Sequence, residues 1–101
     1  PQVYPLARLR AEFLYPDGGD DALAATQHLL TLCPDDAWTH RQLAVLYADR
    51  KDDAAATRHI TRSGELEPAH PSQFAVQAHV HRRADRHAEA KEAVRAGIAR
   101  S

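Results

Sequence analysis

Apolar residues recur at helical spacing along almost the whole chain, in segments that short polar breaks separate. Each segment has room for a helix of about 12 to 14 residues, roughly 18 to 21 Å long at 1.5 Å per residue. None shows the two-residue alternation or the enrichment in β-branched residues that is typical of strands. The pattern predicts six helices and an all-α fold.

The breaks indicate where the helices begin and end. The run Pro-Asp-Gly-Gly at residues 16–19 interrupts the chain, and Asp20 after it can cap a second helix. Pro34 ends that helix, and Asp36 can cap a third that runs to Asp49. The later signals are Asp52 or Asp53 before the fourth helix, Pro68 after it, Pro71 in the first turn of the fifth, and Ala84-Asp85-Arg86 before the sixth.

Several unrelated residue types recur at one constant spacing, which is the spacing from Pro34 to Pro68 and which we call the repeat step. The other sets are Leu9 with Leu43, Phe13 with Tyr47, Ala22 with Ala56 and Ala90, and Thr26 with Ile60 and Val94. Each period holds two helices and a turn, and a single pair would leave one apolar side in water. Stacking such pairs in a row buries that side, so we expect antiparallel helix pairs stacked as an α-solenoid.

The repeat resembles the tetratricopeptide repeat family, most clearly in the unit 37–70. The matching residues of that unit are Leu43, Ala44, Tyr47, Ala56, Ile60 and Pro68. His40 holds the place of the family's first aromatic residue, and Trp38 lies two residues before it. The resemblance implies one domain of residues 1–101 with three repeats, at about 3–36, 37–70 and 71–101, wound as a right-handed solenoid.

Small residues mark where the two helices of a pair should cross most closely. Ala44 and Ala56 have this place in the second unit, and Ala78 and Ala90 have it in the third. Arg10 and Leu29 break the pattern in the first unit, so we expect its helices to be splayed or to act as an end cap. Leu6, Leu9 and Phe13 are expected to face the core of that unit.

Composition limits the classes of partner. The chain has 13 basic and 14 acidic residues, and a net charge of -1 gives no field that would recruit nucleic acid or an anionic membrane. No segment approaches the roughly 20 apolar residues of a membrane span, and no signal peptide is visible. The single cysteine, Cys33, excludes an internal disulfide and a cysteine-based zinc cage. Because the chain begins at Pro1 and lacks methionine, we expect a piece of a longer protein.

The resemblance places the binding surface on the concave side, which the first helix of each pair forms. The candidate residues share one stripe of these helices or flank it: Tyr4, Arg8, Tyr15, Trp38, Arg41, Gln42, Val45, Asp49, His79, Arg82 and Arg83. The set holds more positive than negative charge, which suits an acidic peptide. Trp38 with Arg8 and Arg41 beside it is the expected anchor for a large apolar residue.

Several of these residues have a simpler structural interpretation. Trp38 near a helix start fills the junction between the first and second units equally well. Tyr4 and Tyr15 suit a repeat junction, and Arg82 and Arg83 suit a solvated helix end that interacts favourably with the helix dipole.

Histidines and other reactive side chains give no clear site. The seven histidines are spread over separate segments, and His79 and His81, two residues apart, point to different sides of a helix. No Ser-His-Asp order, phosphate-binding loop or carboxylate pair indicates catalysis, so we expect neither an enzyme nor a cofactor. Cys33 before Pro34 is interpreted as a small apolar filler, and His40 and His81 as partly buried polar residues.

Two functions of different classes follow. The first is a scaffold that binds a peptide segment of another protein, or of its own parent chain, on the concave surface. The second is a structural module that self-assembles or spaces an attached enzyme or membrane-complex domain. Val94 and Ile98 leave the last helix with an apolar outer side, so weak association through that helix is expected. A nucleic-acid partner is a distant third, since it would require a basic groove.

Overall fold

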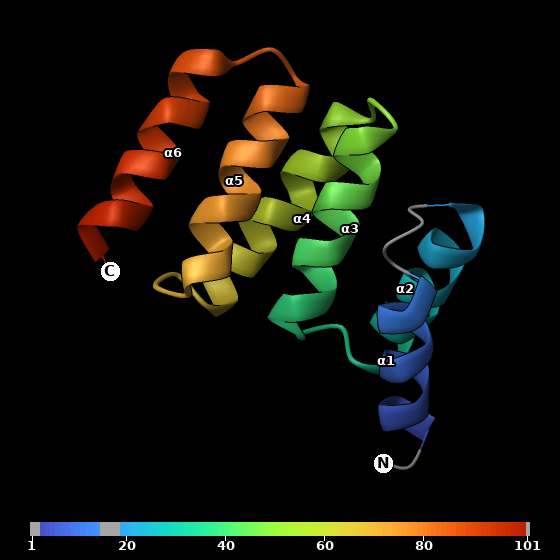
Figure 1. Cartoon of the computed structure of the whole chain (residues 1–101). Coiled ribbons are helices and arrows are strands. Elements are labelled where there is room, and N and C mark those ends of the chain that lie inside the picture. The colour runs from blue at the N-terminus through green and yellow to red at the C-terminus, as the bar shows by residue number, and fades with distance from the viewer. Residues whose placement is uncertain (1–2, 15–18, 101) are drawn as a thin grey trace.

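The computed structural model describes residues 3–14 and 19–100, without the side chains of residues 3–5 and 13. It contains six helices: α1 (Val3–Leu14), α2 (Asp20–Leu32), α3 (Ala37–Asp49), α4 (Asp53–Leu66), α5 (Pro71–Arg83) and α6 (His87–Arg100) (Figure 1). The described residues contain no strand. The all-α prediction is therefore confirmed, and the helices begin and end close to the predicted breaks.

The second and third helix pairs repeat each other at the repeat step. Helix α3 begins at Ala37 and α5 at Pro71, while α4 begins at Asp53 and α6 at His87. The turns inside the pairs agree as well. Lys51 and Asp85, separated by the same step, are the two non-glycine residues with positive φ in the described chain, at 63° and 62°. In the second and third pairs, the backbone conformation therefore recurs at the same spacing as the sequence.

The helix starts use three kinds of cap. The Asp52 carboxylate accepts a hydrogen bond from the backbone N–H of Ala55 at 3.3 Å, which satisfies one free donor of α4. His70 Nδ1 accepts from the backbone N–H of Ser72 at 3.1 Å and performs the same role for α5. Asp20 was expected to cap α2, but Gly19 holds the cap position and Asp20 lies in the first turn.

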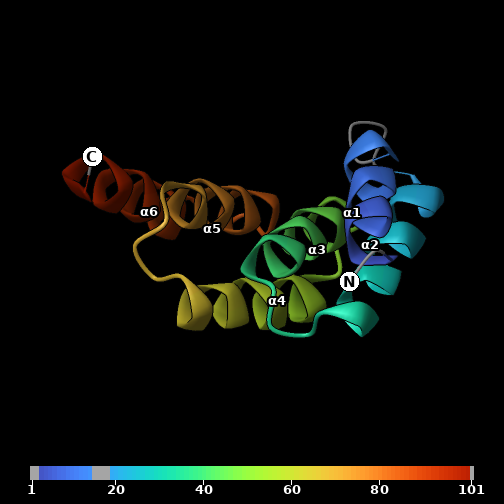
Figure 2. The same ribbon diagram turned by 90° about the horizontal axis from the view of Figure 1, so that it is seen from below.

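The three pairs lie in a row, with α1–α2 and α5–α6 at opposite ends of α3–α4 (Figure 2). Helix α5 contacts both α3 and α4, and its Val80 is 1% exposed. Val80 belongs to an apolar core with Ala44, Ala48, Ala56 and Ile60. In the second pair, Ala44 and Ala56 are fully buried in this one core, as the predicted close crossing of α3 and α4 requires.

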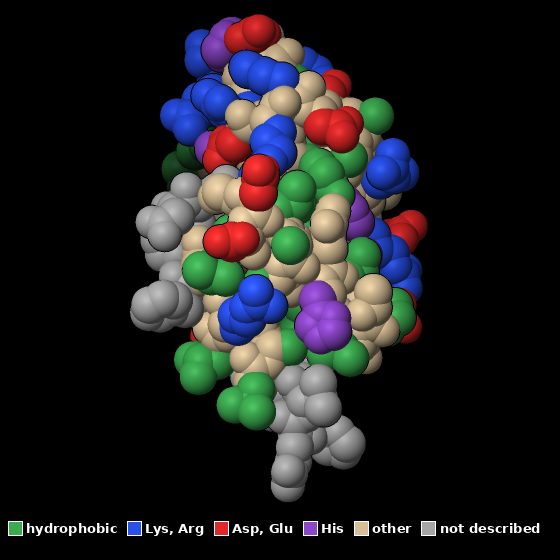
Figure 3. Space-filling view, turned by 90° about the vertical axis from the view of Figure 1, so that its right-hand side faces the viewer, with side chains coloured by type: hydrophobic (Ala, Val, Ile, Leu, Met, Phe, Trp, Pro, Cys, Tyr) green, Lys and Arg blue, Asp and Glu red, His purple; other side chains and the backbone are tan. Residues whose placement is uncertain are grey.

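The first pair is built differently from the prediction. Leu6 and Leu9 are 69% and 62% exposed, so the expectation that they face the core is wrong; the Phe13 side chain lies outside the described part. Arg10 is exposed, because a charged side chain would not be accommodated at the crossing that Ala44 occupies in the second pair. Helix α1 instead turns Ala11 toward α2. Hydrophobic side chains consequently appear on the outer surface of this end of the molecule (Figure 3).

Leu29 also takes a role in the first pair that its place in the repeat did not predict. It is fully buried against Ala11 and Ala25, and Ala7 and Leu14 pack around them. The first pair therefore does depart from the repeat, as Leu29 and Arg10 suggested, and α1 presents Ala11 rather than Arg10 to α2.

Candidate functional site

Helices α3 and α5 bring part of the predicted binding stripe together. The Asp49 carboxylate at the end of α3 lies 2.7 Å from His79 Nε2 and 3.2 Å from Arg83 Nε, both on α5. Arg83 Nη2 also donates a hydrogen bond to the backbone oxygen of Asp49 at 3.2 Å. We refer to Gln42, Val45, Asp49, His79, Arg82 and Arg83 as the α3–α5 surface.

The hydrogen bonds of His79 select one tautomer of its neutral ring. Arg82 Nη2 donates to His79 Nδ1 at 3.3 Å, so the neutral ring carries its proton on Nε2 and donates to Asp49. Asp49 is the single carboxylate of the surface, which also holds two arginines. The surface therefore has an excess of positive charge, and the exposed Arg82 carries it into solvent.

Gln42 and Val45 lie on the turns of α3 that precede Asp49, and both are half-buried. Their spacing to Asp49, at seven and four residues, places them along one side of the helix. They add an amide and an aliphatic side chain to the cationic end of the α3–α5 surface. This combination can hold a polar backbone and a small apolar group of a bound chain.

Trp38 lies at the junction between the first and second pairs. It packs against the core of the first pair, which consists of Ala11, Ala25 and Leu29. The guanidinium carbon of Arg8 stands 4.0 Å from the centroid of the Trp38 ring, and Arg8 Nε pairs with Glu12 at 3.1 Å. This placement favours the packing interpretation of Trp38, since one face of the ring is covered by a cation of the same chain.

Arg41 does not join the α3–α5 surface. Its side chain is 5% exposed, and Nη1 lies 2.8 Å from Oε1 of Glu67, the residue that follows α4. A buried arginine paired in this way holds the second pair together rather than meeting a ligand. The side chain of Tyr4 and the whole of Tyr15 fall outside the described residues. The expected cluster around Trp38 is thus reduced to Arg8.

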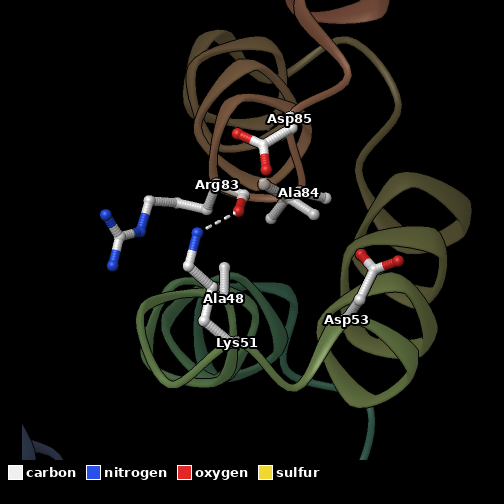
Figure 4. Close-up of a pocket in the computed structure, with 7 residues that line it drawn as sticks. Ala48, Lys51, Asp53, Arg83, Ala84 and Asp85 are labelled. Carbon is white, nitrogen blue, oxygen red and sulfur yellow. Dashed lines mark hydrogen bonds between the residues drawn. The ribbon is translucent and has the colours of Figure 1, made fainter.

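A cavity of about 260 Å³ opens where the ends of α3 and α5 meet the start of α4. Lys51 lines it and donates from Nζ to the backbone oxygen of Arg83 at 2.6 Å (Figure 4). Asp53, on the opposite side of the view, accepts hydrogen bonds from Arg86 at 2.9 and 3.2 Å. Those bonds lower the pKa of Asp53. Lys51 and Asp53 thus bond to a backbone oxygen of α5 and to Arg86, just before α6, and these bonds join the second pair to the third.

The sequence did not identify a histidine pair inside the second helix pair. His40 Nε2 donates to the backbone oxygen of Pro34 at 2.7 Å, which leaves its Nδ1 to accept from His59 Nδ1 at 3.0 Å. The His59 ring stacks on Tyr47 with an interplanar angle of 3°. Burial lowers the pKa of His59 to about 4, with further contributions from His40 and Arg58. No spacing signal could have revealed this pair, because the two residues belong to different helices.

The described part of the chain was also compared with what a metal site, a disulfide and a membrane-spanning helix require. It contains no group of three or more His, Cys, Asp or Glu side chains that could hold a metal ion. Cys33 is half-buried and unpaired with another cysteine. None of the described helices combines the length and the apolarity that a bilayer crossing requires.

Comparisons of the chain with protein-family models, curated proteins and solved structures find no match. The functional assignment therefore rests on the residues and on their geometry.

Proposed function

We propose that this chain is a helical-repeat module of the tetratricopeptide type that binds an acidic peptide segment of a partner protein on the α3–α5 surface. The repeat assignment is supported by the repeat step between the helix starts, from Ala37 to Pro71 and from Asp53 to His87. It is also supported by the positive φ angles of Lys51 and Asp85 at the same step. Three helix pairs in one row suit a solenoid, in which each pair contacts its neighbours.

One observation carries the choice of partner. Asp49 alone offsets the charge of Arg82 and Arg83, and it is engaged by His79 and Arg83. Arg82 is exposed and, among the described residues, donates to a ring nitrogen of His79 and pairs with no carboxylate, so a ligand carboxylate can approach it and form a bidentate pair. Acidic side chains are therefore favoured over basic ones at this end of the surface.

A binding role fits this geometry better than a catalytic one. Both ring nitrogens of His79 are occupied, one by Asp49 and the other by Arg82. The ring therefore has no nitrogen available to take a proton from a substrate. Ion pairs of this kind orient side chains for recognition and suppress partners of the wrong charge.

A peptide array tests the proposal. Twelve-residue peptides with spaced aspartates and glutamates and one large apolar residue are screened, and the selected sequences are measured by fluorescence anisotropy. We expect Arg82→Glu to weaken binding at least about tenfold, because it replaces an attraction by a repulsion. Added salt should weaken the wild-type interaction.

Matched controls locate the site. Arg58→Glu, an equal change of charge at an exposed position on α4, should leave the affinity unchanged. Gln42→Glu should weaken binding if the peptide runs along α3 toward Asp49. Selection of basic or neutral peptides, or an equal loss with Arg58→Glu, would refute the assignment.

Self-assembly through α6 is a second candidate function. Val94 and Ile98 on that helix are 50% and 70% exposed, which is a large apolar exposure for two neighbouring turns. Light scattering over a concentration series distinguishes it from peptide binding. Association that Ile98→Glu abolishes would support it, whereas equal monomeric behaviour of both proteins would exclude it.

A further inference from the structure

Helix α5 packs on the second pair, and its contacts show which residues an added helix uses in this fold. Val76 and Val80 of α5 pack on the apolar core of α3 and α4. Gln73, one turn earlier, donates from Nε2 to the backbone oxygen of Ile60 at 3.0 Å and accepts from the Ser63 hydroxyl at 2.6 Å. The docking face of α5 thus uses positions i, i+3 and i+7, one stripe of a helix.

The same groove exists again between α5 and α6, where no described helix covers it. Ile60 is 8% exposed under α5, whereas its equivalent Val94, one repeat step later, is 50% exposed. Ala44 is fully buried, but its equivalent Ala78 is only half-buried. Two adjoining cavities of about 340 and 280 Å³ follow this line. We call them together the α5–α6 groove.

The floor of the α5–α6 groove is apolar, and cationic groups stand at one end. Ala75, Ala78 and Val94 form the floor between the two helices. At Gly97 the helices approach so closely that an added Cβ would lie 3.0 Å from Cβ of Phe74. Arg82 from α5 and Lys91 from α6 line the opposite end, and no aspartate or glutamate is among the described residues that line the groove.

We propose that the α5–α6 groove is a second binding site, which takes an amphipathic helix of a partner protein with carboxylates near its C-terminal end. This occupant lies on α5 and α6 as α5 lies on α3 and α4. The groove shares His79 and Arg82 with the α3–α5 surface, but Lys91 and Val94 belong to the groove alone, so variants of these two residues test it independently.

Charge complementarity gives the pattern of the occupant. In the second pair Asp49 meets His79 and Arg83 of the docked helix. Its equivalent one repeat step later is Arg83, which Asp49 engages and which does not line the groove. Arg82 and Lys91 line this end instead, so the charge offered to a docked helix is reversed. A helix docked here needs carboxylates at the two positions that correspond to His79 and Arg83, four residues apart.

The apolar stripe of the occupant follows from the same equivalence. Positions corresponding to Val76 and Val80 remain aliphatic, because they meet Ala78 and Val94. The position corresponding to Gln73 becomes aliphatic, since Gly97 stands where Ser63 supplied a hydroxyl group. The expected pattern is therefore apolar at i, i+3 and i+7, and acidic at i+6 and i+10.

The α1 end of a second copy of this chain is a poorer occupant. The exposed apolar residues of α1, Leu6 and Leu9, alternate with Arg8 and Arg10. These arginines would approach Arg82 and Lys91, and like charges at an interface oppose association.

A designed peptide pair tests the proposal without knowledge of the natural partner. The acidic probe has the sequence of residues 71–83 with Gln73→Leu, His79→Glu and Arg83→Glu, and a side-chain staple holds it helical because so short a helix is marginal in water. The control probe carries only Gln73→Leu. By calorimetry with the whole chain, residues 1–101, we expect the acidic probe to bind at least about tenfold more tightly than the control at low salt.

Protein variants then locate the bound probe. Val94→Glu should lower the affinity for the acidic probe at least about tenfold by placing a charge on the groove floor. Lys91→Glu should weaken the acidic probe and strengthen the control probe. Arg10→Glu, the same charge change at an exposed position of α1, should leave both affinities unchanged. Circular dichroism checks that each variant is folded. If Val94→Glu unfolds, Lys91→Glu still tests the proposal, because Lys91 is exposed and its replacement should not affect folding.

Three results would overturn the proposal. Equal binding of the two probes would remove the charge argument. Unchanged binding to both the Val94→Glu and Lys91→Glu variants would place the probe elsewhere. A dimer that must dissociate before the acidic probe binds would assign the groove to a second copy of the chain. Loss of acidic-peptide binding on the α3–α5 surface with intact probe binding here would refute the first site and leave this one.

Discussion

The first and second helix pairs have nearly the same helix lengths, but they turn different sides of their first helix toward the core. In α3, Leu43 and Ala44 are fully buried, and Ala44 belongs to one core with Ala56 and Ile60 of α4. The equivalent residues of α1 are Leu9, which is 62% exposed, and Arg10, which is exposed too. Ala11 is the fully buried residue of α1 instead. One residue of shift along the helix corresponds to a rotation of about 100°.

This difference shows that a repeat period and a packing face are set by different residues. Proline, glycine and aspartate determine where the helices begin and end, and these residues act through the local backbone. The side that packs depends on which position carries a side chain small enough for close approach. Arg10 cannot fill that position, whereas Ala11 can, so α1 rotates and leaves Leu9 in solvent.

The largest expected effect tests this rotation directly. Leu29→Ala removes a fully buried side chain from the core of the first pair, and we expect it to lower the free energy of unfolding by about 2–5 kcal/mol. Leu9→Ala removes an exposed side chain and should change it by less than about 0.5 kcal/mol. Urea unfolding followed by circular dichroism measures both values. Equal losses in the two variants would mean that α1 packs through Leu9, as the repeat alone predicts.

The second prediction concerns pH, and it also separates the two pairs. The pKa of His59 is lowered from 6.5 to about 4 in the folded chain, whereas its equivalent in the first pair is Ala25. Between these pH values the unfolded chain binds a proton at this residue and the native chain does not. Stability from this group is therefore complete above pH 6.5 and is lost as the pH falls toward 4. Because the ring is only half-buried, solvent screening reduces the loss, and we expect about 1–2 kcal/mol.

Two variants attribute the pH dependence to this histidine. His59→Gln keeps a donor for His40 Nδ1 but does not titrate, so the loss of stability between pH 6.5 and 4 should shrink markedly. His28→Gln, at an exposed site on α2, should retain the wild-type dependence. Chemical denaturation at a series of pH values provides the comparison. An unchanged slope in His59→Gln would show that other groups cause the acid sensitivity.

The third prediction addresses the crossing that the first pair lacks. Ala56 is fully buried where α4 meets α3 and α5, so Ala56→Leu should overpack this core and cost about 1–3 kcal/mol. Ala54→Leu, on the exposed side of the same helix, is the control and should cost less than about 0.5 kcal/mol. Thermal melts compare the two. A wild-type melting temperature for Ala56→Leu would refute the close crossing assigned to the second pair.

The sequence predicts the helices better than it predicts the site. Helix bounds depend on signals within a few residues, such as Pro71 at the start of α5 and Asp52 before α4. The meeting of Asp49 with His79 was also accessible, because the helical stripe placed both on one side of the first helix in their units. The repeat period was therefore sufficient to predict a contact between equivalent sides of the first helices of neighbouring units.

Contacts that do not follow the repeat could not be predicted from the period of the sequence. Arg41 shares a sequence stripe with solvent-facing residues, yet it is buried against Glu67, which lies 26 positions later beyond α4. The His40–His59 pair has no spacing rule, since it depends on the distance between two packed helices. Tertiary packing determines the positions of such side chains, and no local pattern in a single sequence predicts that packing.

The smallest expected effect measures how firmly the first pair is joined to the second. Arg8 lies over Trp38 at 4.0 Å, with 34% of its side chain exposed, and a cation–π contact at such a site contributes about 0.5–1 kcal/mol. Arg8 has other partners, including Glu12, so Arg8→Ala alone would not isolate the contact. A double-mutant cycle of Arg8→Ala with Trp38→Leu cancels the contributions of the other contacts of Arg8. A parallel cycle of Arg8→Ala with Glu12→Gln measures the ion pair. Urea unfolding gives the coupling energies, and Trp38 fluorescence follows the junction itself. A coupling near zero would mean that Trp38 is held by packing on the core of Ala11, Ala25 and Leu29, and that α1 joins the second pair through apolar packing without help from the cation.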